Sequence, residues 1–178
     1  MGITKKVWMA VQHFDKEKYW KMRDYIQNYN YTKRINLILL WYVFRVKRME
    51  AFANASTGIK IGPGSAVFES RAQLPHNLYG IIIAPGAPIG KYVRICQQVT
   101  IGNDFQDVNN VPTIGDNVEI YPGAKIVGKV NIGDGAKIGA NSVVFFDVPA
   151  GATVVVERPR VIEHDNSEEQ ETKDKGIL

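Results

Sequence analysis

The sequence predicts a mainly β protein built as a parallel β-solenoid, because two rows of residues recur with a period of six. The first row is aliphatic and is interrupted once, where thirteen residues stand in place of six. It consists of Ile83, Ile89, Ile95, Ile101, Ile114, Ile120, Ile126, Ile132, Ile138 and Val144. The second row follows four residues later, at Ala87, Val93, Val99, Val118, Ala124, Val130, Ala136, Ser142 and Val148. A period of six over ten units indicates a repeat fold and matches neither an α-helix nor a simple strand alternation.

Each six-residue unit is expected to form one short side of a triangular coil. The aliphatic residue then points into the interior, and the second-row residue lies near a corner. Because a coil buries its apolar residues only by stacking on the next one, stability should grow with the number of coils. Before Ile83 the period is uneven: Ile61 and Val67 are expected to keep step with it, and residues 73–82 to form a longer corner.

The chain divides by composition into three segments. Residues 1–56 are expected to form a helical N-terminal segment, residues 57–162 the β-solenoid domain, and residues 163–178 a flexible polar tail. In the first segment Asp15 is suited to be the N-cap of a helix that follows it. A second helix is expected over residues 33–52.

The second expected helix contains an apolar run with basic residues at both ends. Nine of the ten residues Ile35–Phe44 are apolar, whereas a bilayer-spanning helix needs about 20 residues. Two interpretations remain open. Either the helix packs on the end of the solenoid or on a neighbouring subunit, or residues 33–48 make peripheral contact with an anionic membrane surface.

Charge and cysteine content exclude several classes of protein. Residues 1–56 carry 11 basic and 4 acidic side chains, but no nucleic-acid-binding motif accompanies them, so no nucleic-acid partner is expected. The single cysteine, Cys96, excludes a disulfide framework and is interpreted as a small packing residue beside Ile95. No cleavable signal is visible, so a cytoplasmic location is expected. The alternative within this expectation is a cytoplasmic protein in peripheral contact with the inner face of the membrane.

Two stretches are similar to the hexapeptide-repeat acyltransferases, which fold as left-handed parallel β-helices. They read IIIAPGAPIGKYVRICQQVTIGN and VPTIGDNVEIYPGAKIVGKVNIGDGAKIGANSVV. The resemblance covers residues 54–162 and is greatest to serine acetyltransferase and to the O-acetyltransferases of sugars and capsular polysaccharides. It implies an acyltransferase with acetyl-CoA as co-substrate, bound without a metal in a groove between the solenoids of a homotrimer.

The resemblance also implies where acetyl-CoA would be bound. The candidate residues are Gly123 and Ala124 in YPGAK, Ala140 and Ser142 in IGANSVV, and Arg160 near the end of the repeats. Arg160 matches a basic position that reaches the phosphates of CoA in relatives. The closing run around it is one residue shorter than in the family, and Glu157 replaces a Gly.

Acyl transfer to a hydroxyl needs a base for the hydroxyl proton, and histidine suits this role because its unperturbed pKa lies near 6.5. The chain has three histidines: His13, His76 and His164. Family members carry the catalytic histidine shortly before a Gly-aliphatic run, and His76 before Gly80 matches this pattern. The family's orienting residue falls on Asn54 by its spacing, and Glu69, the nearest preceding carboxylate, is the second candidate.

Two departures from serine acetyltransferase favour a sugar acceptor over free serine. That enzyme has an Asp before the catalytic histidine and an Arg–His pair in its extended loop, whereas this chain has Pro75 at the first position and Asn110 with Val111 at the second. The charge and geometry of a bidentate Arg are hard to replace. The main expectation is therefore O-acetylation of a sugar or of a surface-polysaccharide precursor.

The loop that interrupts the repeats contains side chains suited to sugar recognition. Asp104, Asp107 and Asn110 would supply hydrogen bonds, and Phe105 a ring for stacking. Two alternatives stay open: a serine O-acetyltransferase of cysteine biosynthesis, and a non-catalytic solenoid that serves as a scaffold or binding module.

Overall fold

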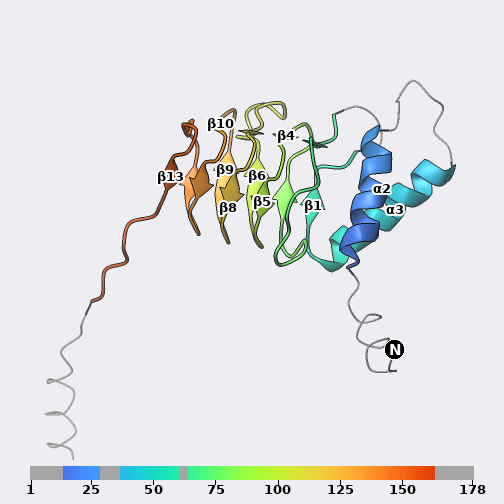
Figure 1. Cartoon of the computed structure of the whole chain (residues 1–178), viewed down its shortest axis with the longest axis horizontal. Coiled ribbons are helices and arrows are strands. Elements are labelled where there is room, and N and C mark those ends of the chain that lie inside the picture. Colours follow the sequence, from blue (N-terminus) through green and yellow to red (C-terminus); the bar gives the residue numbers. More distant parts are fainter. Residues whose placement is uncertain (1–13, 29–36, 61–63, 163–178) are drawn as a thin grey trace, which may run out of the picture.

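The computed structural model describes residues 14–28, 37–60 and 64–162, and Figure 1 shows them as a stack of short strands with two helices at one end. The strands form three parallel sheets, which we call A, B and C after their order along each coil. Sheet A contains β1 (Ser56–Thr57), β3 (Ile82–Ile83), β6 (Thr100–Gly102), β9 (Lys125–Val127) and β12 (Val143–Val144). Sheet B contains β2 (Val67–Phe68), β4 (Pro88–Ile89), β7 (Thr113–Ile114) and β10 (Asn131–Ile132). Sheet C contains β5 (Arg94–Ile95), β8 (Glu119–Ile120), β11 (Lys137–Ile138) and β13 (Thr153–Val154).

The predicted solenoid is confirmed: the fold is a mainly β, left-handed parallel β-helix with short N-terminal helices. Every member of the aliphatic row is at most 2% exposed, and the second row is buried as well. Equivalent residues stack in columns, as Ile83, Ile101 and Ile126 do on sheet A. Each coil therefore buries its aliphatic residues against those of its neighbours, which is how a short repeat acquires a continuous core.

The first coil departs from the prediction. Phe68, not Val67, pairs with Ile89 and points inward, whereas Val67 is 47% exposed. The expectation that Val67 keeps step was therefore wrong, and Ile61 lies outside the described residues. Adjacent residues of a strand point to opposite faces, so an error of one residue in register exchanges the buried side chain for the exposed one.

Three edges join the sheets, and the two irregular segments lie on different edges. Residues 75–81 turn from sheet C to sheet A, because Gln73 bridges to Arg94 on sheet C and Ile82 starts β3 on sheet A. The long loop 103–113 joins β6 of sheet A to β7 of sheet B. We call these the C–A edge and the A–B edge.

Helices α2 (Lys16–Asn28) and α3 (Leu37–Phe52) lie at the end of the stack where the first coil would otherwise be open (Figure 1). The prediction that Asp15 caps the first helix is confirmed, since its Oδ1 accepts from the backbone N–H of Lys18 at 3.0 Å. Trp20 packs edge-to-face on Phe68, with ring centroids 5.3 Å apart. The described part of the second helix begins at Leu37, and neither described helix is long and apolar enough to cross a membrane.

A buried polar network ties both helices to the first coil. Arg23 of α2 donates to Oγ1 and O of Thr57 at 2.6 and 2.9 Å. Glu50 of α3 accepts from the backbone N–H of Thr57 at 3.2 Å and also from its hydroxyl. The Tyr19 hydroxyl lies 2.7 Å from Thr57 Oγ1, and burial raises the pKa of Tyr19 well above its usual range. Thr57 thus occupies an interior position that an aliphatic residue fills in the regular coils.

Candidate active site at the C–A edge

His76 stands on the turn between the first and second coils, held by buried residues on both sides. Leu74 and Leu78 are buried in the core, and Asn77 between them adopts a left-handed backbone conformation with φ 57°. The backbone N–H of Gly80 donates to the carbonyl of Ala53 at 2.8 Å, which ties this turn to the end of α3. The imidazole itself is exposed. The backbone is therefore fixed by packing while the side chain stays accessible.

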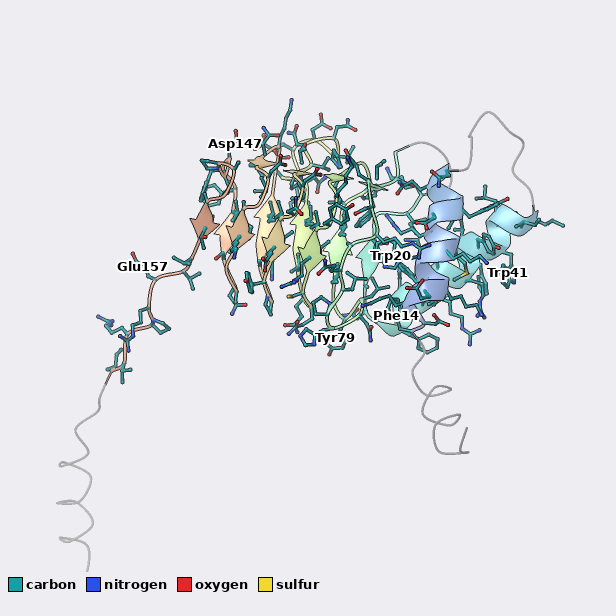
Figure 2. The ribbon with its side chains drawn as sticks, viewed as in Figure 1. Phe14, Trp20, Trp41, Tyr79, Asp147 and Glu157 are labelled. Carbon is teal, nitrogen blue, oxygen red and sulfur yellow. The ribbon has the colours of Figure 1, made fainter. Side chains whose placement is uncertain are left out.

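A cavity of about 770 Å³ lies in front of His76. It is lined by Phe14, Met49, Phe52, Ala53, Pro75, His76, Asn77, Tyr79, Gln97 and Gln98. Figure 2 labels Phe14 and Tyr79, which lie where the helices meet the first coils. One wall is apolar and comes from the helical segment, and the other is polar and comes from the solenoid. Such a combination suits a small polar substrate that must be oriented and shielded from water.

The polar wall of this cavity carries side chains with unused hydrogen-bonding capacity. Among the described residues, neither His76 nor the amide of Gln97 has a hydrogen-bonded partner, and Gln97 Oε1 is buried. A buried oxygen without a donor is costly, so a group that donates to it would be bound favourably. The imidazole is likewise free to accept a proton from a bound hydroxyl.

Neither candidate for orienting His76 lines the cavity. Asn54 follows the last turn of α3 with φ 49°, a conformation typical of the residue that ends a helix, and it is exposed. The carboxylate of Glu69 lies 3.7 Å from Lys91 Nζ, and Glu69 follows sheet B. Within the described part of the chain, no hydrogen bond joins either residue to His76.

The residues expected to bind acetyl-CoA lie along the same edge as His76, with one exception. Backbone hydrogen bonds run up the edge from Gln98 to Tyr79 at 2.9 Å and from Gly123 to Gln97 at 3.1 Å. Asn141 continues the series by donating to Pro122 at 2.9 Å. This ladder brings the turns that contain Gly123 and Ala140 into line with the His76 turn.

The side chains of the two remaining edge candidates, in contrast, point inward. Ala124 and Ser142 belong to the second row of the repeat and are fully buried, and Ser142 Oγ has no partner among the described residues. Only their backbone groups are available to a ligand. Arg160 is the exception to the alignment: it lies after β13 and is exposed.

The loop 103–113 has a defined shape but does not reach the His76 cavity. Oδ1 of Asp104 accepts from the N–H groups of Gln106 and Asp107 at 3.0 and 3.3 Å, and Oδ2 accepts from the amide of Asn110 at 3.0 Å. Desolvation raises the pKa of Asp104, but these hydrogen bonds together outweigh it and lower the pKa below its ordinary value, so the carboxylate is ionised at neutral pH. Phe105 is 93% exposed and, with Val108, lines a separate groove along sheet A.

Cys96 lies beside the interior column of sheet C and is buried, as its packing interpretation requires. Burial raises the pKa of its thiol, which therefore remains protonated and weakly nucleophilic at neutral pH. The other two histidines, His13 and His164, lie outside the described residues.

Sequence reasoning missed most of the residues that line the cavity. Gln97 could have been found by counting, because it follows Ile95 by two positions just as His76 follows Leu74 by two. Gln98 and Tyr79 lie on the same turns. Phe14 and Phe52 come from the helical segment, and no repeat pattern places them beside His76.

Comparisons with known proteins agree with this architecture. The family described as bacterial transferase hexapeptide (six repeats) matches residues 112–145. A serine acetyltransferase from Helicobacter pylori is 34% identical over 126 residues, which are 70% of this chain and 72% of that protein. The chain belongs to the serine acetyltransferase family. A Bacillus licheniformis serine acetyltransferase is 38% identical over 120 residues, 67% of this chain and 55% of that protein.

Solved structures of serine acetyltransferases have the same fold. The Neisseria gonorrhoeae enzyme in complex with serine is 34% identical with a TM-score of 0.54, and the match covers 67% of this chain and 48% of that one. A serine acetyltransferase in complex with CoA is 26% identical with a TM-score of 0.57, covering 79% and 54% of the two chains. This chain spans about half the length of the Bacillus relatives that it matches.

The expected sugar acceptor is overturned by these relatives, which are named serine acetyltransferases at 33–42% identity. The structure shows where one of the two departures lies. The loop whose missing Arg–His pair argued against serine lies on the A–B edge, and in a single chain it does not line the His76 cavity. Its residues therefore say nothing about the immediate surroundings of the histidine in the same chain.

Proposed function

We propose that this protein is an acetyl-CoA-dependent serine O-acetyltransferase in which His76 is the general base. The observation that carries the proposal is the exposed imidazole of His76 in a cavity at the C–A edge. The relatives named serine acetyltransferase, and the Neisseria structure that contains serine, support L-serine as the acceptor.

The proposed reaction is a direct transfer. The hydroxyl oxygen of serine attacks the thioester carbonyl carbon of acetyl-CoA while Nε2 or Nδ1 of His76 takes the hydroxyl proton. The tetrahedral intermediate then collapses, the carbon–sulfur bond breaks, and the proton passes from the imidazole to the CoA sulfur. General-base catalysis by a histidine contributes about 10²–10⁴-fold to such a step.

We propose that acetyl-CoA lies along the C–A edge, where its thioester would meet His76. The ladder of backbone hydrogen bonds from Tyr79 to Asn141 supports this placement, because it aligns the turns of the candidate residues. Gly123 has φ 74°, and a side chain there would collide with Asn141, so its turn presents bare backbone to a ligand. Arg160 would reach the phosphates, and the structure of a relative with CoA supports the co-substrate.

We propose further that a homotrimer completes each site, with loop 103–113 of a neighbouring subunit closing the cavity. The described lining of the cavity contains no carboxylate for the ammonium group of serine, whereas the loop offers Asp104 and Asp107. Asn110 holds the loop in shape, and Phe105 is exposed enough to cover a bound substrate. A cytoplasmic location agrees with the use of acetyl-CoA.

Serine acetylation is tested directly with the purified full-length chain. Thiol release from acetyl-CoA should depend on L-serine, and mass spectrometry should identify O-acetylserine. L-alanine is the matched control, because it keeps the ammonium and carboxylate groups but has no hydroxyl. Thiol release that is equal with serine and alanine, or without amino acid, would contradict the proposal.

Sharing of the site between subunits is tested by complementation. His76→Ala should lower the activity by about 10²–10⁴-fold. Asp104→Ala should also be strongly impaired, because it removes the acceptor of three hydrogen bonds that shape the loop. Co-expressed as mixed trimers, the two variants should regain part of the activity, since some sites combine an intact histidine with an intact loop. An active Asp104→Ala enzyme, or no regain on mixing, would contradict this arrangement.

A further inference from the structure

The outer face of α3 is an exposed apolar surface at the end of the molecule. We define it as Leu37, Leu40, Trp41, Phe44, Arg45 and Arg48, which recur at spacings of three and four and so share one side of the helix. All four apolar members are at least 40% exposed. The opposite side of α3 is buried and includes Leu39, Val46, Met49 and Glu50.

The packed side of α3 already has its partner within the chain. Tyr42 meets Tyr25 of α2 edge-to-face, with ring centroids 4.9 Å apart, and Glu50 joins the buried network. Figure 2 shows Trp20 toward the solenoid, whereas Trp41 lies at the far side of the helices. Among the described residues, α3 therefore packs on α2 and the first coil through its other side, and an exposed apolar patch of this kind marks an interaction surface.

The charge on α3 defines the kind of partner. The described helix carries Arg45, Lys47 and Arg48, and its single acidic residue, Glu50, is buried and paired with Lys47 at 3.0 Å. The Arg45 and Arg48 guanidinium carbons each lie 5.7 Å from a ring centroid, of Trp41 and Phe52 respectively. The cations thus lie beside the aromatic rings at the same surface, and this helix exposes no carboxylate to neutralise them.

A second copy of the chain is a poor match for this face. In a two-fold contact the same patch appears on both subunits, so Arg45 and Arg48 would meet cations without an exposed carboxylate on either α3. A partner that has both an apolar interior for the aromatic side chains and a negatively charged surface for the arginines fits better. A lipid surface with anionic headgroups supplies both, since aromatic and aliphatic side chains enter the acyl boundary while arginines remain at the phosphates.

We propose that the outer face of α3 docks the protein on an anionic membrane surface. This inference does not depend on the proposed function. The helix lies in the plane of the interface, with its packed side toward α2 and the solenoid, and it does not cross the bilayer. Of the two interpretations that the sequence left open, packing on the solenoid end accounts for the inner side of α3, and membrane contact accounts for the outer side.

The proposal is tested by sedimentation of the full-length chain with lipid vesicles. Binding should be strong to vesicles of phosphatidylcholine with phosphatidylglycerol and weak to phosphatidylcholine alone. It should fall when ionic strength rises from about 0.01 to 0.5 M, because salt screens the contribution of the arginines. Arg45→Gln with Arg48→Gln should weaken binding roughly 30-fold, from the free energy that each basic residue contributes near an anionic surface.

The apolar contribution is tested with a matched pair of double variants. Trp41→Ser with Phe44→Ser should abolish sedimentation with vesicles, whereas Phe145→Ser with Phe146→Ser should leave it unchanged. The two pairs are comparably exposed, at 52% and 63% against 71% and 48%, but the second pair lies on the solenoid. Equal melting temperatures would exclude unfolding as the cause.

Three outcomes would overturn the proposal. The first is equal binding to neutral and anionic vesicles, and the second is wild-type binding by the Trp41→Ser, Phe44→Ser variant. The third is a lower molar mass of that variant by light scattering without any vesicle binding by the wild type. This last result would assign the outer face to a contact between protein chains.

Discussion

Replacing His76 with alanine is expected to lower kcat for serine acetylation by about 10²–10⁴-fold, the contribution of general-base catalysis. The imidazole is exposed and has no hydrogen-bonded partner among the described residues, so its loss removes no contact that holds the turn together. The melting temperature should therefore change little. Steady-state kinetics with serine and acetyl-CoA, beside a thermal denaturation curve, measure both quantities.

Chemical rescue separates a catalytic from a structural role for His76. Free imidazole added to the His76→Ala enzyme should restore part of the activity, because the cavity of about 770 Å³ leaves room for it where the side chain was. The wild-type enzyme in the same imidazole concentration is the control. Loss of less than tenfold on substitution, or a lowered melting temperature with no rescue, would remove His76 from the role of base.

Replacing Glu50 with alanine is expected to destabilise the protein by about 1–3 kcal/mol for each buried donor that it leaves without an acceptor. Glu50 is 1% exposed and accepts from both the N–H and the hydroxyl of Thr57. Without it these donors lose their acceptor, and Lys47 loses the carboxylate with which it pairs at 3.0 Å. Chemical denaturation monitored by tryptophan fluorescence would follow the change, since Trp20 packs against the first coil.

Glu17→Ala is the matched control for Glu50→Ala. The Glu17 carboxylate also pairs with an arginine of the solenoid, Arg71, at 3.1 Å, but its side chain is 84% exposed. Exposed ion pairs contribute only about 0–1 kcal/mol, so this substitution should have little effect. Similar losses for the two variants would mean that the buried network does not hold the helices on the solenoid.

The regular part of the fold could be predicted because every repeat places the same type of residue at the same position. A buried column needs an aliphatic residue at every sixth position, and from Ile83 to Val144 the sequence supplies one everywhere except at the interruption between Ile101 and Ile114. The first coil lacks this redundancy. Thr57 takes an interior position because Arg23 of α2 and Glu50 of α3 satisfy its polar groups, and the six-residue period does not predict contacts with the helices.

The site was predicted only as far as the repeats reach. His76 and the turns of Gly123 and Ala140 share an edge, as the six-residue register requires. Phe14 and Phe52 are brought to the cavity by the packing of helices, which periodicity does not describe. The acceptor was predicted wrongly because two departures, at Pro75 and in loop 103–113, were weighed above the resemblance to serine acetyltransferase, and relatives of that name at 33–42% identity overturn this choice.

The stacking of coils also fixes the distance along the solenoid axis between the turn of His76 and the last coil. Along sheet C the interior positions run from Leu74 through Ile95, Ile120 and Ile138 to Val154, which are four steps between neighbouring strands. At about 4.8 Å a step, the turn of His76 and the last coil are about 19 Å apart along the axis. An insertion or deletion of one whole coil would preserve every side-chain register but change that distance by one step. Under the proposed placement of acetyl-CoA along the C–A edge, the number of coils would therefore set how far the bound co-substrate can extend from His76.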